Sequence, residues 1–323
     1  MEVVSRKRLM LFTGSANLSL AEEVAELLGV RLGGLERSVF ANGEIYVRPT
    51  DSVRGTDCFV LQSHSDPINF HIMEQLIAID ALNRASARRI TAVVPYFGYS
   101  RQDKKVMPRE PISARLMGDM FLAAGADRIA SVDLHTGQVQ GFIHKPFDHL
   151  TALPVFTDYL RDRLQGPTTI VSPDAGGVKR AEKYARQLDS YVAFIHKRRE
   201  ADRHNESEAL AVIGKVEGRH AIIVDDIIDT AGTVVNAVDL LKEKGALSVS
   251  VAATHGILSG PAVERIKNSD IEELVISNTL PASPGIQSLD RVKVLSIAPL
   301  LAEAIQAIFM ESSVSQIFLG DNQ

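Results

Sequence analysis

The sequence predicts an α/β protein of two domains, each with a central, mainly parallel sheet flanked by helices, and three observations support this fold class. The chain has 323 residues, whereas a single hydrophobic core stops growing at roughly 250–300 residues. Short apolar runs alternate with amphipathic stretches along the whole chain, the pattern of parallel strands joined by covering helices. Residues 113–135 and 233–255 also repeat the same order of helix and strand signals.

Nine short apolar runs predict buried strands. Several of them are followed by loops rich in Gly, Ser, Asp or Thr and then by apolar residues at helical spacing, as expected when each strand leads into a helix. The runs are Leu9–Phe12, Cys58–Gln62, Ile90–Pro95, Ile129–Asp133, Thr169–Ser172, Val192–Ile195, Ala221–Val224, Ser248–Ala253 and Leu274–Ser277.

The two similar segments predict a duplicated α/β domain. In each, a Ser or Thr suited to a helix N-cap is followed by about three turns of helix, a Gly suited to the C-cap, an apolar strand and a His. These landmarks are Ser113, Gly125 and His135 in one segment and Thr233, Gly245 and His255 in the other.

The domain boundary is predicted where Pro and Asp residues interrupt the periodicity near residues 148–156. The first domain is expected to span residues 1–153 and the second residues 154–306. We expect the tail, residues 307–323, to return to the first domain, with a short strand at Ser312–Leu319.

Composition favours a cytoplasmic globular protein that binds neither nucleic acid nor membrane. The net charge of -5 lacks the basic excess of a general nucleic-acid binder. No run approaches the roughly 18 apolar residues of a membrane span, and Leu9–Phe12 is too short for the apolar part of a signal peptide. Cys58 is the only cysteine, which excludes an internal disulfide and suits a reducing compartment.

The strongest local signal is Val224–Thr233, VDDIIDTAGT, between a predicted strand and a predicted helix. Its last four residues fall at the helix N-terminus, where backbone N–H groups and the helix dipole favour a phosphate. Asp225 and Asp226 leave the end of the strand, on opposite sides of it, and suit either the vicinal hydroxyls of a sugar or a divalent cation. Together the two features predict a pentose phosphate site, whereas a lone Asp-Thr pair would indicate only a capped turn.

A second loop, Val171–Arg180, repeats this logic with the residues Asp174, Gly176 and Gly177. It could hold a second anion such as pyrophosphate, with Asp174 on its metal. A Gly-Gly turn followed by solvated basic residues is an equally good interpretation.

The segment His196–Glu208 follows a predicted strand and contains almost no large apolar residue. Its composition predicts a solvated, mobile loop. A long charged loop beside a phosphate site is also typical of a closing lid, in which Lys197 and Arg199 would stabilise a transferring phosphoryl group.

Three stretches of the first half add weaker signals. Tyr96–Lys105 follows one predicted strand, and Asp133 and His135 follow the next, where they could share a metal–phosphate unit. Phe40–Glu44 predicts a hairpin turn whose aromatic face could hold a purine. The chain contains neither a P-loop nor a GxGxxG sequence, and no Cys–His cluster suggests zinc.

The motifs FANGE, YFGYSRQDKK, DLHTGQVQGF, SPDAGG, HKRR and VDDIIDTAGT occur here in one order, from residue 40 to residue 233. That set closely resembles the ribose-phosphate pyrophosphokinases of the phosphate-activated class. The resemblance covers nearly the whole chain, and it implies two duplicated phosphoribosyltransferase-type domains. It also implies pyrophosphoryl transfer from ATP to ribose 5-phosphate, with Mg²⁺ as cofactor and AMP as by-product.

The resemblance assigns roles residue by residue. The binding roles fall into five groups. These are ribose hydroxyls (Asp225, Asp226), the 5-phosphate loop (Asp229, Thr230, Ala231, Gly232, Thr233), the pyrophosphate loop (Asp174, Gly176, Gly177), ATP (Arg101, Gln102, His135, with Phe40, Asn42 and Glu44 from a neighbouring subunit) and magnesium (Asp133, His135, Asp174).

The remaining roles are catalytic and regulatory. Lys197 and Arg199 match the catalytic lid residues of the family. An adenine pocket shared between subunits implies a homo-oligomer, usually a hexamer, with inorganic phosphate and ADP as effectors. The residues that resemble their binding site are Ser52, Arg54, Ser86, Ser313 and Ser315.

One position departs from the family pattern. His144 stands where the family usually has an Asp, and a His does not supply the hard oxygen ligand that Mg²⁺ prefers. Two alternatives stay open at this point. They are a base-dependent phosphoribosyltransferase and a non-catalytic regulatory paralogue of the synthetase.

Overall fold

The computed structural model describes residues 7–164, 166–198 and 209–318. Among these residues the chain divides into two compact units. The first comprises Met1–Ala152, Thr279–Pro281 and Ser296–Gln323, and the second comprises Leu153–Asn278 and Ala282–Leu295.

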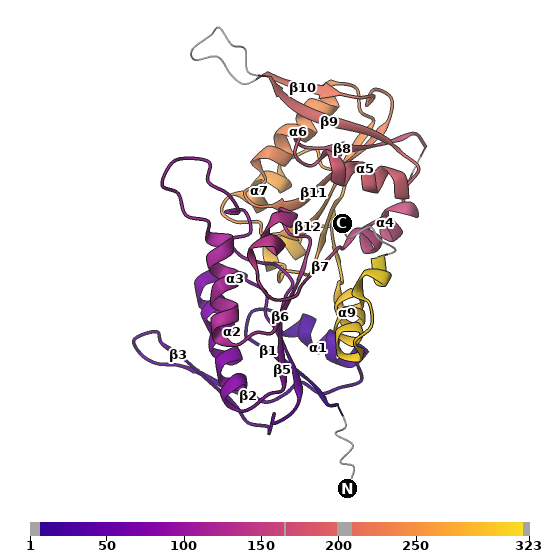
Figure 1. Ribbon diagram of the computed structural model, residues 1–323. Helices are drawn as coiled ribbons and strands as arrows, with labels where there is room; N and C mark the ends of the chain where they lie inside the picture. The colour runs from indigo at the N-terminus through magenta and orange to yellow at the C-terminus, as the bar shows by residue number, and fades with distance from the viewer. Residues whose placement is uncertain (1–6, 165, 199–208, 319–323) are drawn as a thin grey trace. The chain divides into compact units, whose positions relative to one another are not determined.

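The first unit contains a five-stranded sheet in which all neighbouring strands are parallel (Figure 1). Helices α2 and α3 lie on one face, and α1 and α9 pack together on the other. In sheet order the strands are β1 (Leu9–Thr13), β4 (Asp57–Leu61), β5 (Arg89–Val94), β6 (Arg128–Val132) and β7 (Phe147–Leu150). The helices are α1 (Leu18–Leu27), α2 (Ile68–Arg84), α3 (Ser113–Ala124), α9 (Ala298–Met310), and the 3₁₀ turns η1 (Gly137–Phe142) and η2 (Val314–Phe318).

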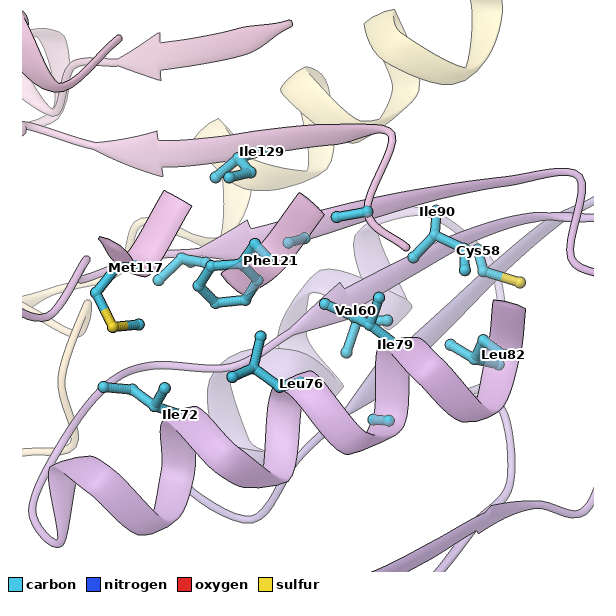
Figure 2. Close-up of a cluster of buried hydrophobic side chains, with 14 of the residues drawn as sticks. Cys58, Val60, Ile72, Leu76, Ile79, Leu82, Ile90, Met117, Phe121 and Ile129 are labelled. Carbon is cyan, nitrogen blue, oxygen red and sulfur yellow. The ribbon is translucent and has the colours of Figure 1, made fainter. Parts of the chain in front are cut away.

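The core of this unit follows from alternation along its central strands. All five residues of β4 are buried, as expected for a parallel strand covered on both faces. Cys58 and Val60 point to the α2 side, where they meet Leu76, Ile79 and Phe121 (Figure 2).

A separate antiparallel hairpin, β2 (Leu35–Val39) and β3 (Ile45–Pro49), extends from the first unit (Figure 1). It is joined by the turn 40–44, in which Gly43 has a φ of +90°. The hairpin turn predicted at Phe40–Glu44 is therefore confirmed.

The second unit contains a seven-stranded sheet that is parallel except for the pair β9–β10 at one edge. In sheet order its strands are β10 (Ala209–Ile213), β9 (Tyr191–Arg198), β8 (Thr168–Ser172), β11 (His220–Ile228), β12 (Ser248–Gly256), β13 (Leu274–Ser277) and β14 (Val292–Leu295). Its helices are α4 (Leu153–Arg161), α5 (Val178–Gln187), α6 (Gly232–Glu243), α7 (Ala262–Lys267) and α8 (Pro284–Gln287).

The predicted fold class is confirmed, since each unit has a mainly parallel sheet with flanking helices. Each of the nine predicted runs coincides with a strand, although the runs predicted to end at Gln62, Pro95 and Asp133 extend one residue past the end of β4, β5 and β6. The two similar segments also have the same structure, because β5–α3–β6 and β11–α6–β12 each join two neighbouring parallel strands. Gly125 and Gly245 both have the predicted positive φ, of +112° and +83°.

Two local predictions are wrong. Ser113 and Thr233 are not N-caps, because the caps of α3 and α6 are Ile112 and Ala231 and neither helix has a side-chain cap hydrogen bond. The segment predicted as a strand at 312–319 contains the 3₁₀ turn η2 instead. It packs against α9 through the buried Phe318, so its apolar residue serves a helix contact rather than a sheet.

Strands β7, β10 and β14 were not predicted. Each is short, and β7 and β14 carry polar residues such as Asp148 and Lys293 that hide the apolar signal. In the described part of the chain, no helix combines the length and apolar character that crossing a membrane requires.

Candidate active site

The site in the second unit begins at the carboxyl end of β11. This strand runs on to Ile228, beyond the Val224 predicted as its end, so Asp225 and Asp226 lie within it. Asp226 is buried, with 3% of its surface exposed, whereas 22% of the Asp225 side chain remains exposed. The carboxylates of both residues converge on one partner.

That partner is Arg180, in the first turn of α5. Its guanidinium lies 3.1 Å from Oδ1 of Asp225 and 3.0 Å from Oδ1 of Asp226. A planar guanidinium can bind two carboxylates at once, which a lysine cannot do. The sequence indicated only a basic helix start here, since nothing in it shows which residue 45 positions away would be the partner.

The burial and the proximity of the two carboxylates change the pKa of Asp225. Burial, reinforced by the neighbouring Asp226 carboxylate, raises the pKa of Asp225 to about 8, while Arg180 opposes the rise. The backbone N–H of Asp226 also donates to Oδ1 of Asp225 at 2.9 Å. The pair therefore offers both an acceptor and a bound proton near neutral pH, which suits recognition of hydroxyl groups.

The loop after β11 leads into α6, which begins at Gly232. Ala231, a buried residue, adopts a left-handed conformation with a φ of +59°, a strained arrangement for a residue with a Cβ. The turn directs the first N–H groups of a 12-residue helix toward the loop, as an anion site requires. The predicted position of Thr230–Thr233 at a helix N-terminus is confirmed.

Two side chains that the sequence did not single out support this loop. Arg265 of α7 donates from Nη1 to the carbonyl oxygen of Thr230 at 2.9 Å. The Ser259 hydroxyl donates to a carboxylate oxygen of Asp229. Both supporters come from the segment after β12, which pairs with β11 and so brings them to the same edge of the sheet.

The second loop joins β8 to α5, and it is closed by its own aspartate. Oδ1 of Asp174 accepts from the backbone N–H of Gly177 at 2.9 Å, and the Ser172 hydroxyl donates to the carbonyl of Asp174 at 2.7 Å. A Cβ at Gly177 would lie 2.6 Å from the Ser172 Oγ, so a larger residue there would displace the Ser172 hydroxyl from its hydrogen bond. Gly176 is exposed beside Asp174 on the same turn. Because α5 also carries Arg180, this loop and the aspartate pair are built on connected elements.

The segment predicted as a lid loop begins as a strand in the structure. His196 and Lys197 lie in β9, which runs to Arg198 and pairs with β10, so the charged stretch starts as a strand. Lys197 lies opposite Leu210 in this register. Arg199 and the rest of the predicted loop to residue 208 lie outside the described residues.

The loops of the first unit meet after β5 and β6. Thr136, next to His135, donates from its hydroxyl to Oδ2 of the buried Asp103 at 2.7 Å, which joins the loop carrying Arg101 and Gln102 to the one carrying His135. The side-chain oxygen of Gln102 accepts from the Ser113 hydroxyl at 2.6 Å, and the backbone carbonyl of Gln102 accepts from the N–H of Ala114.

The predicted metal residues are divided between the two units. Oδ2 of Asp133 accepts from the N–H of Ala152 at 3.1 Å. Asp133 and His135 belong to the first unit and Asp174 to the second. No group of three or more His, Cys, Asp or Glu side chains that could hold a metal occurs among the residues the structure describes. His144 is exposed, and Asp148, four residues further along the chain, is paired with Arg128 at 2.5 Å.

The remaining predicted residues lie on the surface of the first unit. Phe40 is 54% exposed, with its ring edge-on to Tyr46, and the Asn42 side chain accepts from the N–H of Glu44. Among the regulatory candidates, Arg54 precedes Gly55, whose backbone N–H donates to the carbonyl of Ser86 at 3.0 Å. Ser313 and Ser315 share a hydrogen bond of 2.9 Å, and Ser52 is exposed.

Comparison with known proteins gives the same family from two directions. Residues 9–125 match the N-terminal domain of ribose phosphate pyrophosphokinase, and residues 203–319 match the phosphoribosyl synthetase-associated domain. The chain is 52% identical to a ribose-phosphate pyrophosphokinase of Streptomyces avermitilis, over 98% of each chain. It is 55% identical to one of Bifidobacterium longum, over 97% of this chain and 93% of that protein.

A solved structure agrees. The crystal structure of phosphoribosylpyrophosphate synthetase from Mycobacterium smegmatis superposes with a TM-score of 0.88 at 48% identity, and the match covers 95% of this chain and 100% of that one. Identity at this level over full length fixes both the fold and the ancestry. The chain belongs to the ribose-phosphate pyrophosphokinase family.

Proposed function

We propose that this protein transfers the β,γ-pyrophosphoryl group of ATP to the C1 hydroxyl of ribose 5-phosphate, giving 5-phosphoribosyl 1-diphosphate and AMP. The family supports the reaction. One observation supports the sugar site best. Asp225 and Asp226 converge on Arg180, and the strand that carries them leads directly into the N-terminus of α6. The residues proposed to bind the ribose hydroxyls and those proposed to bind the 5-phosphate therefore lie on one continuous segment of the chain.

The reaction is an in-line attack of the C1 oxygen on the β-phosphorus, with AMP leaving. Asp225 and Asp226 hold the ribose hydroxyls, while the loop Asp229–Thr233 binds the 5-phosphate and the loop Asp174–Gly177 the pyrophosphate. Much of the rate then comes from positioning the two substrates. Lys197 and Arg199 stabilise charge on the transferring group.

In the first unit, Arg101, Gln102 and His135 bind ATP. The hydrogen bond between Thr136 and Asp103, which joins the two loops that carry these residues, supports a shared site. Phe40, Asn42 and Glu44 complete the adenine site of a neighbouring copy. This makes the protein a homo-oligomer, which we take to be a hexamer. Inorganic phosphate and ADP act as effectors at Ser52, Arg54, Ser86, Ser313 and Ser315.

Magnesium is the proposed cofactor. Mg²⁺ is usually held by one or two carboxylates together with substrate phosphates rather than by an all-protein cage. The described residues fit this pattern, since Asp174 lies exposed on a loop and no three-carboxylate cluster occurs there. Asp133, His135 and Asp174 are the candidates to hold it, and it would neutralise charge on the triphosphate. The free, buried thiol of Cys58 suits the cytoplasm as the proposed location.

A single assay separates the candidate activities. AMP release from ATP is measured with and without ribose 5-phosphate, in the presence of Mg²⁺. The synthetase releases AMP only with the sugar, a regulatory paralogue releases none, and a base phosphoribosyltransferase instead consumes 5-phosphoribosyl diphosphate without ATP. The double variant Asp225→Asn, Asp226→Asn should lose ribose 5-phosphate binding by calorimetry, and unchanged binding would remove the proposed sugar site.

A further inference from the structure

His64, which has no part in the mechanism above, lies in a buried polar network of the first unit. It follows β4 and is 1% exposed. Its Nδ1 lies 2.9 Å from the backbone nitrogen of Gly98, and its Nε2 lies 3.0 Å from Oε1 of Gln75 on α2. Its own backbone N–H donates to the carbonyl of Tyr96 at 3.3 Å. His64 thus holds the chain after β5 by its backbone and by its ring.

The donor and the acceptor in each hydrogen bond of the His64 ring follow from a backbone group that can only donate. Gly98 can only donate, so Nδ1 accepts and the ring proton lies on Nε2, where it donates to Gln75 Oε1. The Gln75 amide nitrogen then donates to the Val60 carbonyl at 2.9 Å. Burial lowers the pKa of His64 to about 4, so the ring is neutral and Nδ1 keeps its lone pair.

Packing leaves the ring no alternative position. It is stacked on Phe121 with ring centroids 5.8 Å apart and planes 9° apart, and Figure 2 shows Phe121 projecting from α3 into the core. Phe97 lies against the same ring at 5.9 Å. A Cβ at Gly98 would lie 3.2 Å from both Cβ and Nδ1 of His64 and 2.9 Å from Cδ1 of Ile68. The backbone segments at His64 and at Gly98 can approach this closely only because residue 98 is glycine.

The segment after Gly98 is a tight turn. The N–H of Ser100 donates to the Phe97 carbonyl at 3.3 Å, and that of Gln102 donates to the Tyr99 carbonyl at 2.9 Å. Tyr99 has a φ of +65°, an uncommon conformation for a large side chain. A shift at Gly98 is therefore passed on to Arg101 and Gln102 over three or four residues.

We propose that His64 is a positioning residue for ATP, which sets the place of Arg101 and Gln102 by accepting the Gly98 N–H. This rests on the proposed role of these two residues in binding ATP. It predicts a selective effect, since the ribose 5-phosphate site lies on other elements. It assigns no contact between His64 and the nucleotide.

The test is a set of variants in full-length protein, assayed by AMP release. His64→Leu keeps the apolar bulk but removes the acceptor, and we expect the KM for ATP to rise about tenfold with the KM for ribose 5-phosphate within about twofold of wild type. His64→Asn places a carbonyl oxygen near the position of Nδ1, and we expect it to restore the KM for ATP to within about threefold of wild type. Leu82→Ala, at the far end of α2 in the same core (Figure 2), is the control for lost packing alone.

The outcomes separate cleanly. A rise in the KM for ATP in His64→Leu, rescue in His64→Asn, and a lowered Tm with unchanged KM values in Leu82→Ala together support the proposal. An unchanged KM for ATP in His64→Leu overturns it, as does an equal rise for both substrates or an Asn variant that behaves as Leu. If His64→Leu does not fold, Gln75→Met, which removes the partner of His64 Nε2, decides instead. A rise in the KM for ATP alone then supports the proposal, and an unchanged KM for ATP or an equal rise for both substrates overturns it. Wild-type protein that releases no AMP would instead defeat the proposed reaction.

Discussion

At the residue scale, Arg180 controls the charge of the proposed sugar site. Two carboxylates on adjacent residues of one strand would repel each other, and one of them is almost fully buried. The guanidinium contacts both at about hydrogen-bond distance, so it offsets the repulsion and the cost of burial together.

Replacing Arg180 with Gln should therefore lower the free energy of unfolding by about 1.5–3 kcal/mol at pH 7. Urea denaturation measures this, with Lys179→Gln, an exposed neighbour, as the control expected to stay within about 0.5 kcal/mol of wild type. In a background of Asp225→Asn, Asp226→Asn, the same Arg180→Gln change should cost much less. Equal costs in both backgrounds would show that the ion pairs contribute nothing.

The raised pKa of Asp225 predicts how stability depends on pH. A carboxyl with a higher pKa in the folded state favours folding below its ordinary value of 3.8, and this contribution is lost as pH rises to about 8. Asp225→Asn cannot ionise, so its stability relative to wild type should improve as pH rises from 5 to 8. Because 22% of the side chain is exposed, we expect only part of the full linkage, about 1–2 kcal/mol. Urea titrations at four pH values test this, and a flat difference contradicts it.

At the scale of elements, strand β9 carries the start of the lid that is proposed to close over the transferring group. Strands β9 and β10 pair in antiparallel register at the edge of an otherwise parallel sheet. Strand β10 is the edge strand of this sheet, and β8 lies between β9 and β11. This is consistent with a lid whose base is ordered structure rather than loop.

Lys197→Ala should reduce kcat by about 10²–10⁵ with little change in the KM for ATP, because its charge acts on the transition state rather than on the bound substrate. Single-turnover AMP release measures the chemical step directly. Lys215→Ala, an exposed lysine just after β10, is the matched control and should leave kcat within about twofold of wild type. Near-normal turnover in Lys197→Ala would defeat the proposed catalytic role.

At the scale of the whole molecule, the β2–β3 hairpin is the candidate contact of the proposed homo-oligomer. It extends from the first unit with Phe40 exposed at its tip, and neither strand joins the main sheet (Figure 1). An exposed aromatic on a projecting hairpin suits a site completed by another copy.

If the adenine site is shared, two inactive variants should complement each other. Co-expression of Phe40→Ala, Asn42→Ala with Lys197→Ala should restore about a quarter of wild-type activity, since random assembly gives that share of sites an intact hairpin and an intact lysine. Two differently tagged copies of Lys197→Ala serve as the control and should give no gain. A mixture no more active than its parts would place the whole site within one chain.

Much of the fold and of the proposed site could be predicted from the amino-acid sequence, because the signals for these features lie within contiguous segments. Apolar runs predict the buried strands, and loops such as DTAGT and SPDAGG combine the residue types that a phosphate site needs. Even the positive φ of Gly125 and Gly245 follows from their place after a helix. These features depend on neighbours within a few residues, so one chain suffices to find them.

Contacts between residues that are far apart in the sequence could be identified only from the folded structure. The periodicity of α5 places Arg180 in its first turn but does not reveal Asp225 and Asp226 as its partners. The same holds for His64, whose contact with Gly98 depends on the pairing of β4 with β5 and on the close approach that a glycine allows. Burial patterns report that a side chain is covered but not what covers it, because the partner is set by strand order and register, which are properties of the whole sheet.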